Sequence, residues 1–287
     1  MKLMKRFNEV LTAHLGSGKA IAGGILLSTL LLLLTAASTL AQQSQSAEEE
    51  LIKPSRPDVA DPAEFQPPGV LQVEYGIDAN FRAEEFRDQQ RAPLTLRFAA
   101  SRRLLLQFDL DTIISERDEE THARATGVRD TRLGAQVLAV KDGEGHPALA
   151  FAYFLKLPSA SETKQLGSGR VDHRVVALVS KKMGNTDIDF NVAYLNVGRE
   201  DSDRRASGAQ AALSFTHKLT DKLSLIGEVS GQSEEDVQPR GLFPLGAPTI
   251  KASERVQFDA GVRFGIGAEA PRVGAFAGLS VGIGKRR

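Results

Sequence analysis

Two pairs of carboxylates, Asp109 with Asp111 and Asp187 with Asp189, are the residues whose spacing could do chemistry in this chain. Side chains two residues apart in an extended chain point to the same side, about 7 Å from each other. Such a pair could line a constriction that favours cations, or it could hold Ca²⁺, which prefers oxygen ligands. The alternative, which we favour, is that these carboxylates pair with Arg97, Arg132 and Arg263 inside the fold.

The histidines form no recognisable catalytic pattern. His122 and His146 lie in expected loops, while His173 and His217 lie on expected strands without a Ser or Asp placed to pair with them. Nucleophilic catalysis needs a nucleophile within hydrogen-bond reach of a base. The chain has no Cys, which excludes disulfides and thiolate metal sites. We therefore expect no catalytic residues, no bound metal, no cofactor and no enzymatic activity.

The elements that would position these side chains are strands, and the stretch 127–158 shows the pattern most clearly. It predicts two strands of about ten residues around a polar turn at 141–146. One face is apolar in both strands: Leu133, Ala135, Val137 and Ala139, then Leu149, Phe151, Tyr153, Leu155 and Leu157. The opposite face is mixed and includes Arg132 and Gln136. Because side chains alternate across a strand, this period of two predicts two different surroundings.

The same alternation recurs from Val70 to the end of the chain and defines eleven strands. Short and long connections alternate between them, and no amphipathic helix is predicted after residue 69. This pattern is typical of an all-β, antiparallel, up-and-down transmembrane β-barrel, here over residues 70–284. Both ends of the barrel should lie on one side, so the strand number should be even. We expect about 12 strands, with the missing one inside 233–252 and ten as the second choice.

A polar lumen and a lipid exterior would explain the two faces. The charged residues of the polar face are the candidates for lining the lumen: Glu74, Asp78, Arg97, Asp109, Asp111, Arg132, Asp187, Asp189, Asp259 and Arg263. A soluble β-sandwich or a lipocalin-like barrel could show the same alternation. The N-terminal export signal and the asymmetry of the connections favour the membrane barrel.

The N-terminus predicts export. Residues 1–41 combine basic residues, an apolar run at 20–34 and an exit of small residues, which is typical of a signal peptide cleaved after Ala41. A retained membrane anchor is the alternative. Residues 42–69 are rich in Gln, Ser, Glu and Pro, so we expect a flexible periplasmic leader. The chain has 36 Lys/Arg and 36 Asp/Glu, and this zero formal net charge predicts no nucleic-acid partner.

Three short motifs stand at the start of the expected barrel and in its best-defined hairpin. Arg56-Pro57-Asp58 precedes a Pro-Gly-x-x-Gln-x-Glu strand at 68–74, Gly127 to Gly134 reads Gly-x-x-Asp-x-x-Leu-Gly, and Leu157-Pro158-Ser159 follows. The chain thereby resembles the family of phenol-degradation meta-pathway transporters over about residues 55–283. Arg129 replaces a glycine of the family pattern, and a basic tail replaces its aromatic end. The resemblance implies a small outer-membrane barrel.

These observations predict a narrow channel or transporter for small solutes in the bacterial outer membrane, with lumen charges setting its selectivity. A twelve-strand barrel is narrower than a sixteen-strand porin, so we expect the connections 159–170 and 233–252 to act as lids. The expected partners are outer-membrane lipid, the barrel-assembly machinery and a small solute of unknown identity, with aromatic compounds suggested by the resemblance. The alternatives are a non-conducting structural or surface-interaction barrel and a secreted soluble β-barrel.

Overall fold

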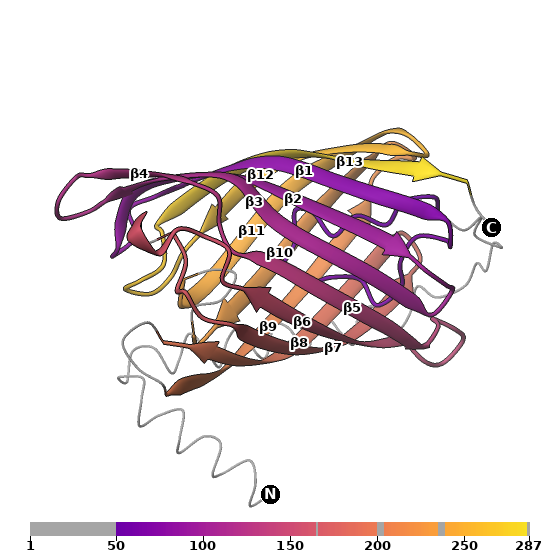
Figure 1. Ribbon diagram of the computed structural model, residues 1–287. Coiled ribbons are helices and arrows are strands. Elements are labelled where there is room, and N and C mark those ends of the chain that lie inside the picture. The colour runs from indigo at the N-terminus through magenta and orange to yellow at the C-terminus, as the bar shows by residue number, and fades with distance from the viewer. Residues whose placement is uncertain (1–49, 165, 200–203, 235–238, 286–287) are drawn as a thin grey trace, which may run out of the picture. The chain divides into compact units, whose positions relative to one another are not determined.

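The computed structural model describes residues 50–164, 166–199, 204–234 and 239–285. The signal peptide expected at 1–41 and residues 42–49 of the expected leader lie outside the described residues. The described chain forms strands and one short 3₁₀ turn (Figure 1). Their bounds are β1 (Val70–Phe81), β2 (Phe86–Ala99), β3 (Leu104–Asp118), β4 (Arg124–Gly127), β5 (Thr131–Val140), β6 (Ala148–Leu157), η2 (Glu162–Lys164), β7 (Asp172–Met183), β8 (Thr186–Gly198), β9 (Arg205–Lys218), β10 (Leu223–Gln232), β11 (Gly241–Ser253), β12 (Val256–Phe264) and β13 (Val273–Gly284).

The sheet closes on itself through its first and last strands. β1 and β13 pair antiparallel along their whole length, from Val70 opposite Gly284 to Phe81 opposite Val273. Every other neighbouring pair of strands is also antiparallel. The short strand β4 pairs only with the last part of β3, from Ile114 to Arg117. The barrel wall therefore has twelve strands, as the alternation of the sequence predicted, and the second choice of ten is wrong.

The strand that the sequence concealed is β11, and its prolines explain why. Pro244 and Pro248 of β11 lack the N–H that a strand residue can donate to its neighbour, and neither is paired with a residue of β12. The ladder between β11 and β12 passes from Gly246 opposite Val262 directly to Thr249 opposite Asp259. The ladder on the other edge, against β10, is continuous from Leu223 to Gln232. Residues 241–252 thus belong to the wall, and the expectation that the whole of 233–252 is a lid is wrong.

The connections differ at the two ends of the barrel. Tight links join the strands at one end, such as the two residues between β7 and β8, where Gly184 has a φ of +63°. Longer links such as 158–171 and 265–272 join them at the other end. The chain enters β1 and leaves β13 at the end with the tight links, which we call the short-turn end; the opposite end is the long-loop end.

The two faces of the wall separate as the alternation predicts. In β6 the outward Phe151 is 58% exposed, whereas Ala150, Ala152 and Phe154 are buried inside. Large apolar side chains are exposed on other strands too, among them Ile77, Val137, Val175, Tyr194, Phe258 and Phe264. None of the described residues forms a helix that is long and apolar enough to cross a membrane.

The expected flexible leader is the largest correction to the prediction. Residues 50–69, which we call the plug, enter the interior of the barrel, and Ala63 and Phe65 join the buried cluster of Ala99, Leu105 and Leu195. The polar composition of this segment prevents it from building a core alone. Inside the barrel it needs no core of its own, because the wall supplies both apolar neighbours and hydrogen-bond partners.

Candidate functional site: the barrel lumen and its plug

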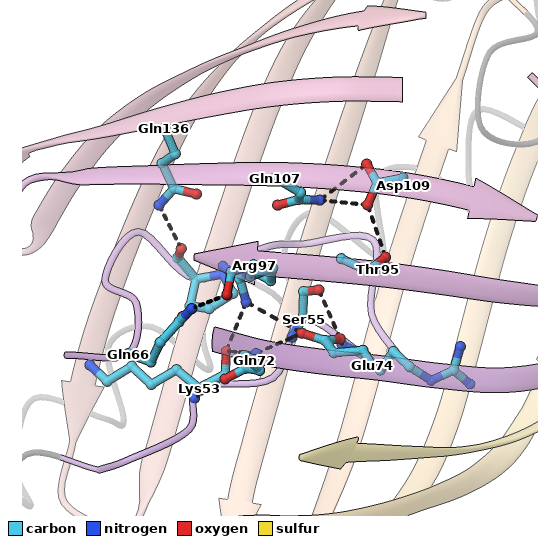
Figure 2. A network of polar contacts seen from close by, with 12 residues as sticks. Lys53, Ser55, Gln66, Gln72, Glu74, Thr95, Arg97, Gln107, Asp109 and Gln136 are labelled. Carbon is cyan, nitrogen blue, oxygen red and sulfur yellow. Dashed lines mark hydrogen bonds and ion pairs between the residues drawn. The ribbon is translucent and has the colours of Figure 1, made fainter. Parts of the chain in front are cut away.

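Two inward side chains of β1 bind the main chain of the plug. Gln72 and the backbone of Lys53 exchange two hydrogen bonds, N to Oε1 at 2.8 Å and Nε2 to O at 2.9 Å. The carboxylate of Glu74 accepts from the backbone N–H groups of Ser55 (3.1 Å) and Arg56 (2.9 Å) and from the Ser55 hydroxyl (3.1 Å), as Figure 2 shows in part. Extended backbone has donors and acceptors that need partners when buried, and these side chains supply them.

Arg97 on β2 holds the same part of the plug from the neighbouring strand. Its Nη1 donates to the carbonyl of Lys53 at 2.7 Å and lies 3.6 Å from Glu74 (Figure 2). Gln66, further along the plug, donates from Nε2 to the Arg97 carbonyl at 2.7 Å. The side chains of Glu74 and Arg97 have no exposed surface. A buried ion is costly unless it is paired and hydrogen-bonded, and here the plug supplies three donors to Glu74 and one acceptor to Arg97.

The far wall of the barrel binds the middle of the plug. Glu228 on β10 accepts from the N–H groups of Val59 (2.7 Å) and Ala60 (2.8 Å). The N–H of Ala63 donates to the Ser180 hydroxyl at 2.8 Å, and Gln136 donates to the Ala63 carbonyl at 2.9 Å. The plug is therefore bonded to β1 and β2, to β5 and β7, and to β10, so it crosses the lumen.

Arg56 is the charged anchor of the plug. Its guanidinium lies 3.2 Å from Asp259 on β12 and 3.8 Å from Asp78 on β1. The glycines Gly76 and Gly278 are direct cross-strand partners, and a Cβ on either would collide with this guanidinium. The absence of side chains at these two positions creates the space that Arg56 fills.

Asp58 is a plug carboxyl in an unfavourable electrostatic setting. One of its oxygens accepts from the Ser214 hydroxyl at 2.6 Å. Burial raises the pKa of the Asp58 carboxyl well above its usual value, and the charge of Glu228 raises it further. The ionised form of Asp58 is thus disfavoured in the docked plug.

A cavity of about 880 Å³ lies beyond the plug, toward the long-loop end. Asp109 lines it and accepts from Thr95 (2.9 Å) and Gln107 (3.0 Å), as Figure 2 shows. Arg132 stands directly opposite Asp109 in the β3–β5 register. Asp111 pairs with Arg91 at 3.1 Å. Asp109 and Asp111 are thus engaged by other side chains, and the described residues contain no group of three or more potential metal ligands.

The remaining predicted lumen residues lie on inward positions of β8 and β12. Asp189 contacts the Ser180 hydroxyl, and Asp187 stands opposite Lys182 near the short-turn end. Arg263 lies over the ring of Phe276, 5.5 Å from its centroid. Of the partners favoured from the sequence for these carboxylates, Arg132 stands opposite Asp109. Asp111 pairs instead with Arg91, Arg97 pairs with Glu74, and Arg263 makes a cation–π contact.

Five residues of the contact between plug and wall were absent from the candidate lumen residues drawn from the sequence: Arg56 of the plug, and Gln72, Gln136, Ser180 and Glu228 of the wall. The signal for Glu228 was present, because it is a charged residue at an inward position of a predicted strand, between Ile226 and Ser230. The alternation also places Gln136 on the polar face, but it predicts no contact with the plug for Gln136, Gln72 or Ser180. Their importance depends on a segment far away in the chain.

The strand imidazoles lie on the outer face of the wall. His173 bonds to the Tyr153 hydroxyl (2.7 Å) and His217 to the Thr186 hydroxyl (2.9 Å). In the described part of the chain neither imidazole is hydrogen-bonded to a carboxylate. The described residues therefore do not assemble a Ser/Thr–His–carboxylate triad at either position.

Solved structures share the barrel fold with this chain, whereas curated protein sequences give no significant match. The COG4313 outer membrane channel from Pseudomonas putida F1 is 14% identical, with a TM-score of 0.59 over 81% of this chain and 100% of that one. The KdgM porin (8%, TM-score 0.47, 73% and 98%) and the CymD monoaromatic hydrocarbon channel (8%, TM-score 0.42, 77% and 90%) are more distant.

A family model covers both parts of the site. The model described as the MetA-pathway of phenol degradation matches residues 54–283. The match begins inside the plug and ends in β13, so plug and wall lie in one match. The resemblance inferred from the sequence motifs is confirmed: the chain belongs to this phenol-degradation family of outer-membrane barrels.

Proposed function

We propose that this protein is a channel for small solutes in the bacterial outer membrane, and that the plug controls its permeability. The observation that carries this proposal is the division of the wall, which has exposed apolar side chains outside and buried charged side chains inside. A lipid exterior and a polar lumen need such a division, and a secreted soluble barrel would not expose so many large apolar residues. Outer-membrane lipid and the barrel-assembly machinery are the partners that this location implies.

The plug crosses the proposed route. Its hydrogen bonds reach β1, β5, β7 and β10, so solute can pass only when the plug shifts. The connection 158–171 is the remaining candidate for a lid at the long-loop end. Asp130 accepts from the N–H of Ala160 (2.9 Å), and Lys164 donates to the carbonyl of Thr126 (2.9 Å), so the loop is fastened beside β4.

The family links the proposed solutes to phenol degradation, and small aromatic compounds are therefore part of the proposal. One observation favours a second candidate, a barrel that does not conduct and serves a structural or surface role. The plug has many bonds to the wall, and a permanently docked plug would leave no route for solutes. Recording from single barrels in a planar bilayer distinguishes the two.

The experiment compares the natural protein with a double variant, Glu74→Gln and Glu228→Gln. Both substitutions remove a carboxylate that accepts plug N–H groups. The channel proposal predicts small, intermittent conductance in the natural protein and a larger or longer-lived open state in the variant. The control is Glu144→Gln with Asp221→Asn, two exposed charges in short turns. Folded barrels without conductance in all three proteins would support the non-conducting role and refute the channel.

A further inference from the structure

The charges of the long-loop cavity are not balanced. Fourteen Asp and Glu residues line it, or thirteen without Asp58, whose ionised form is disfavoured, against nine Lys and Arg residues. Most of these cations are already engaged. Arg91 pairs with Asp111, Lys156 with Asp130, and Arg199 with Glu234. Arg240 pairs with Glu269, and the guanidinium of Arg174 lies over the ring of Phe154.

Carboxylates gather at one side of the mouth, which we call the acidic rim: Glu84, Glu116, Asp118, Glu119 and Glu120. They come from the β1–β2 link, the end of β3 and the link that follows. A backbone hydrogen bond from Glu119 to Glu85 (3.3 Å) joins the two links. Strand alternation turns Glu116 and Asp118 toward the cavity and Arg117 away from it. In the described chain no cation lies within ion-pair distance of Glu84, Glu119 or Glu120.

The deeper part of the cavity contains a buried carboxylate oxygen without a hydrogen-bond donor, independently of the rim. Asp78 lines the cavity with a side chain that is 10% exposed, and its Oδ1 has no hydrogen-bond donor in the described structure. The cation nearest to that oxygen is Arg56, at 3.8 Å, which lies closer to Asp259 at 3.2 Å. One guanidinium thus contacts two carboxylates, and Arg91, opposite Asp78 on β2, and Arg263 attract the Asp78 carboxylate without donating a hydrogen bond to its Oδ1.

We propose that this cavity selects small cations, such as alkali ions and short alkyl amines, over anions of the same size. The inference rests on the proposed channel function and names its class of solute. A cleft lined by one sign of charge concentrates ions of the opposite sign, by about tenfold or more. Rings of carboxylates select cations in pores by the same attraction. Aromatic carboxylates are therefore disfavoured solutes for this cavity.

Reversal potentials in a KCl gradient test the selectivity of the conducting protein. We expect a permeability ratio of K⁺ to Cl⁻ of about ten. The triple variant Glu84→Gln, Glu119→Gln, Glu120→Gln should bring the ratio toward one. Its matched control removes three exposed carboxylates from the short-turn end: Glu144→Gln, Asp221→Asn and Glu254→Gln. A ratio at or below one in the natural protein would overturn the inference and leave the channel function intact.

A second measurement needs no conductance, because the natural chain has no Cys. A single substitution, Val197→Cys, places a thiol on the cavity lining, and Thr220→Cys places one in an exposed short turn. The rates of modification by cationic and anionic methanethiosulfonate reagents are compared at each position. We expect the cationic-to-anionic rate ratio at 197 to exceed that at 220 by about tenfold and to fall in high salt. Equal ratios at the two positions would overturn the inference even for a barrel that does not conduct.

Discussion

The carboxylate of Glu74 and the guanidinium of Arg97 lie 3.6 Å apart on neighbouring strands, and neither side chain has any exposed surface. The plug is what encloses them, because Ser55 and Arg56 donate to Glu74 while Lys53 accepts from Arg97. An ion pair whose hydrogen-bond partners include a third segment couples the position of that segment to the charges of the lumen.

Removing the charge of Glu74 should loosen the plug. Glu74→Gln leaves Arg97 buried beside a neutral group and weakens three hydrogen bonds to the plug, at a cost of about 2 kcal/mol. Hydrogen exchange at the amides of Ser55 and Arg56 should accelerate by about thirtyfold. The control is Glu144→Gln in an exposed turn. Unchanged exchange at both amides would show that Glu74 does not hold the plug.

The space around Arg56 gives a second prediction. Gly76→Ala should push the guanidinium away from Asp259, because the new Cβ would collide with it. Adding Gly76→Ala to Arg56→Ala should then have little further effect on plug exchange, since both changes remove the same contact. Gly227→Ala and Gly246→Ala are matched controls, as a Cβ at either position meets nothing within 4 Å. Additive effects of the first pair would contradict the proposed contact.

Asp58 predicts a pH dependence of plug docking. Its pKa is raised in the docked state, so docking is favoured when the carboxyl is protonated. Docking should weaken as the pH rises above about 3.9, the value of a free aspartic acid, and should level off above the raised pKa. Asp58→Asn should reduce this dependence and slow plug exchange at neutral pH. Docking that strengthens as the pH rises over this range would contradict the prediction.

The barrel wall could be predicted from the sequence because its signal is local. Leu133 and Phe151 face outward and Arg97 and Asp109 face inward, as a period of two requires. β11 was harder to place because Pro244 and Pro248 are rare within strands, and only the need for an even strand number predicted it.

The plug could not be predicted, because its partners are distant in sequence. Val59 and Glu228 are 169 residues apart, and Ala63 and Ser180 are 117 apart. The composition of residues 50–69 predicts only that they cannot fold alone. The composition does not show that the side chains of Gln72, Gln136 and Glu228 form hydrogen bonds with this backbone inside the lumen.

A reversible cross-link between plug and wall tests the central claim most directly. Ala63→Cys with Ser180→Cys places two thiols where the N–H of residue 63 lies 2.8 Å from the side chain of residue 180, in a chain without other Cys. The single variants serve as controls. We predict that the disulfide forms on oxidation, that single-channel conductance is then lost, and that reduction restores it. Failure of the disulfide to form in the folded barrel, or equal conductance before and after reduction, would contradict a plug that occupies the lumen and controls its permeability.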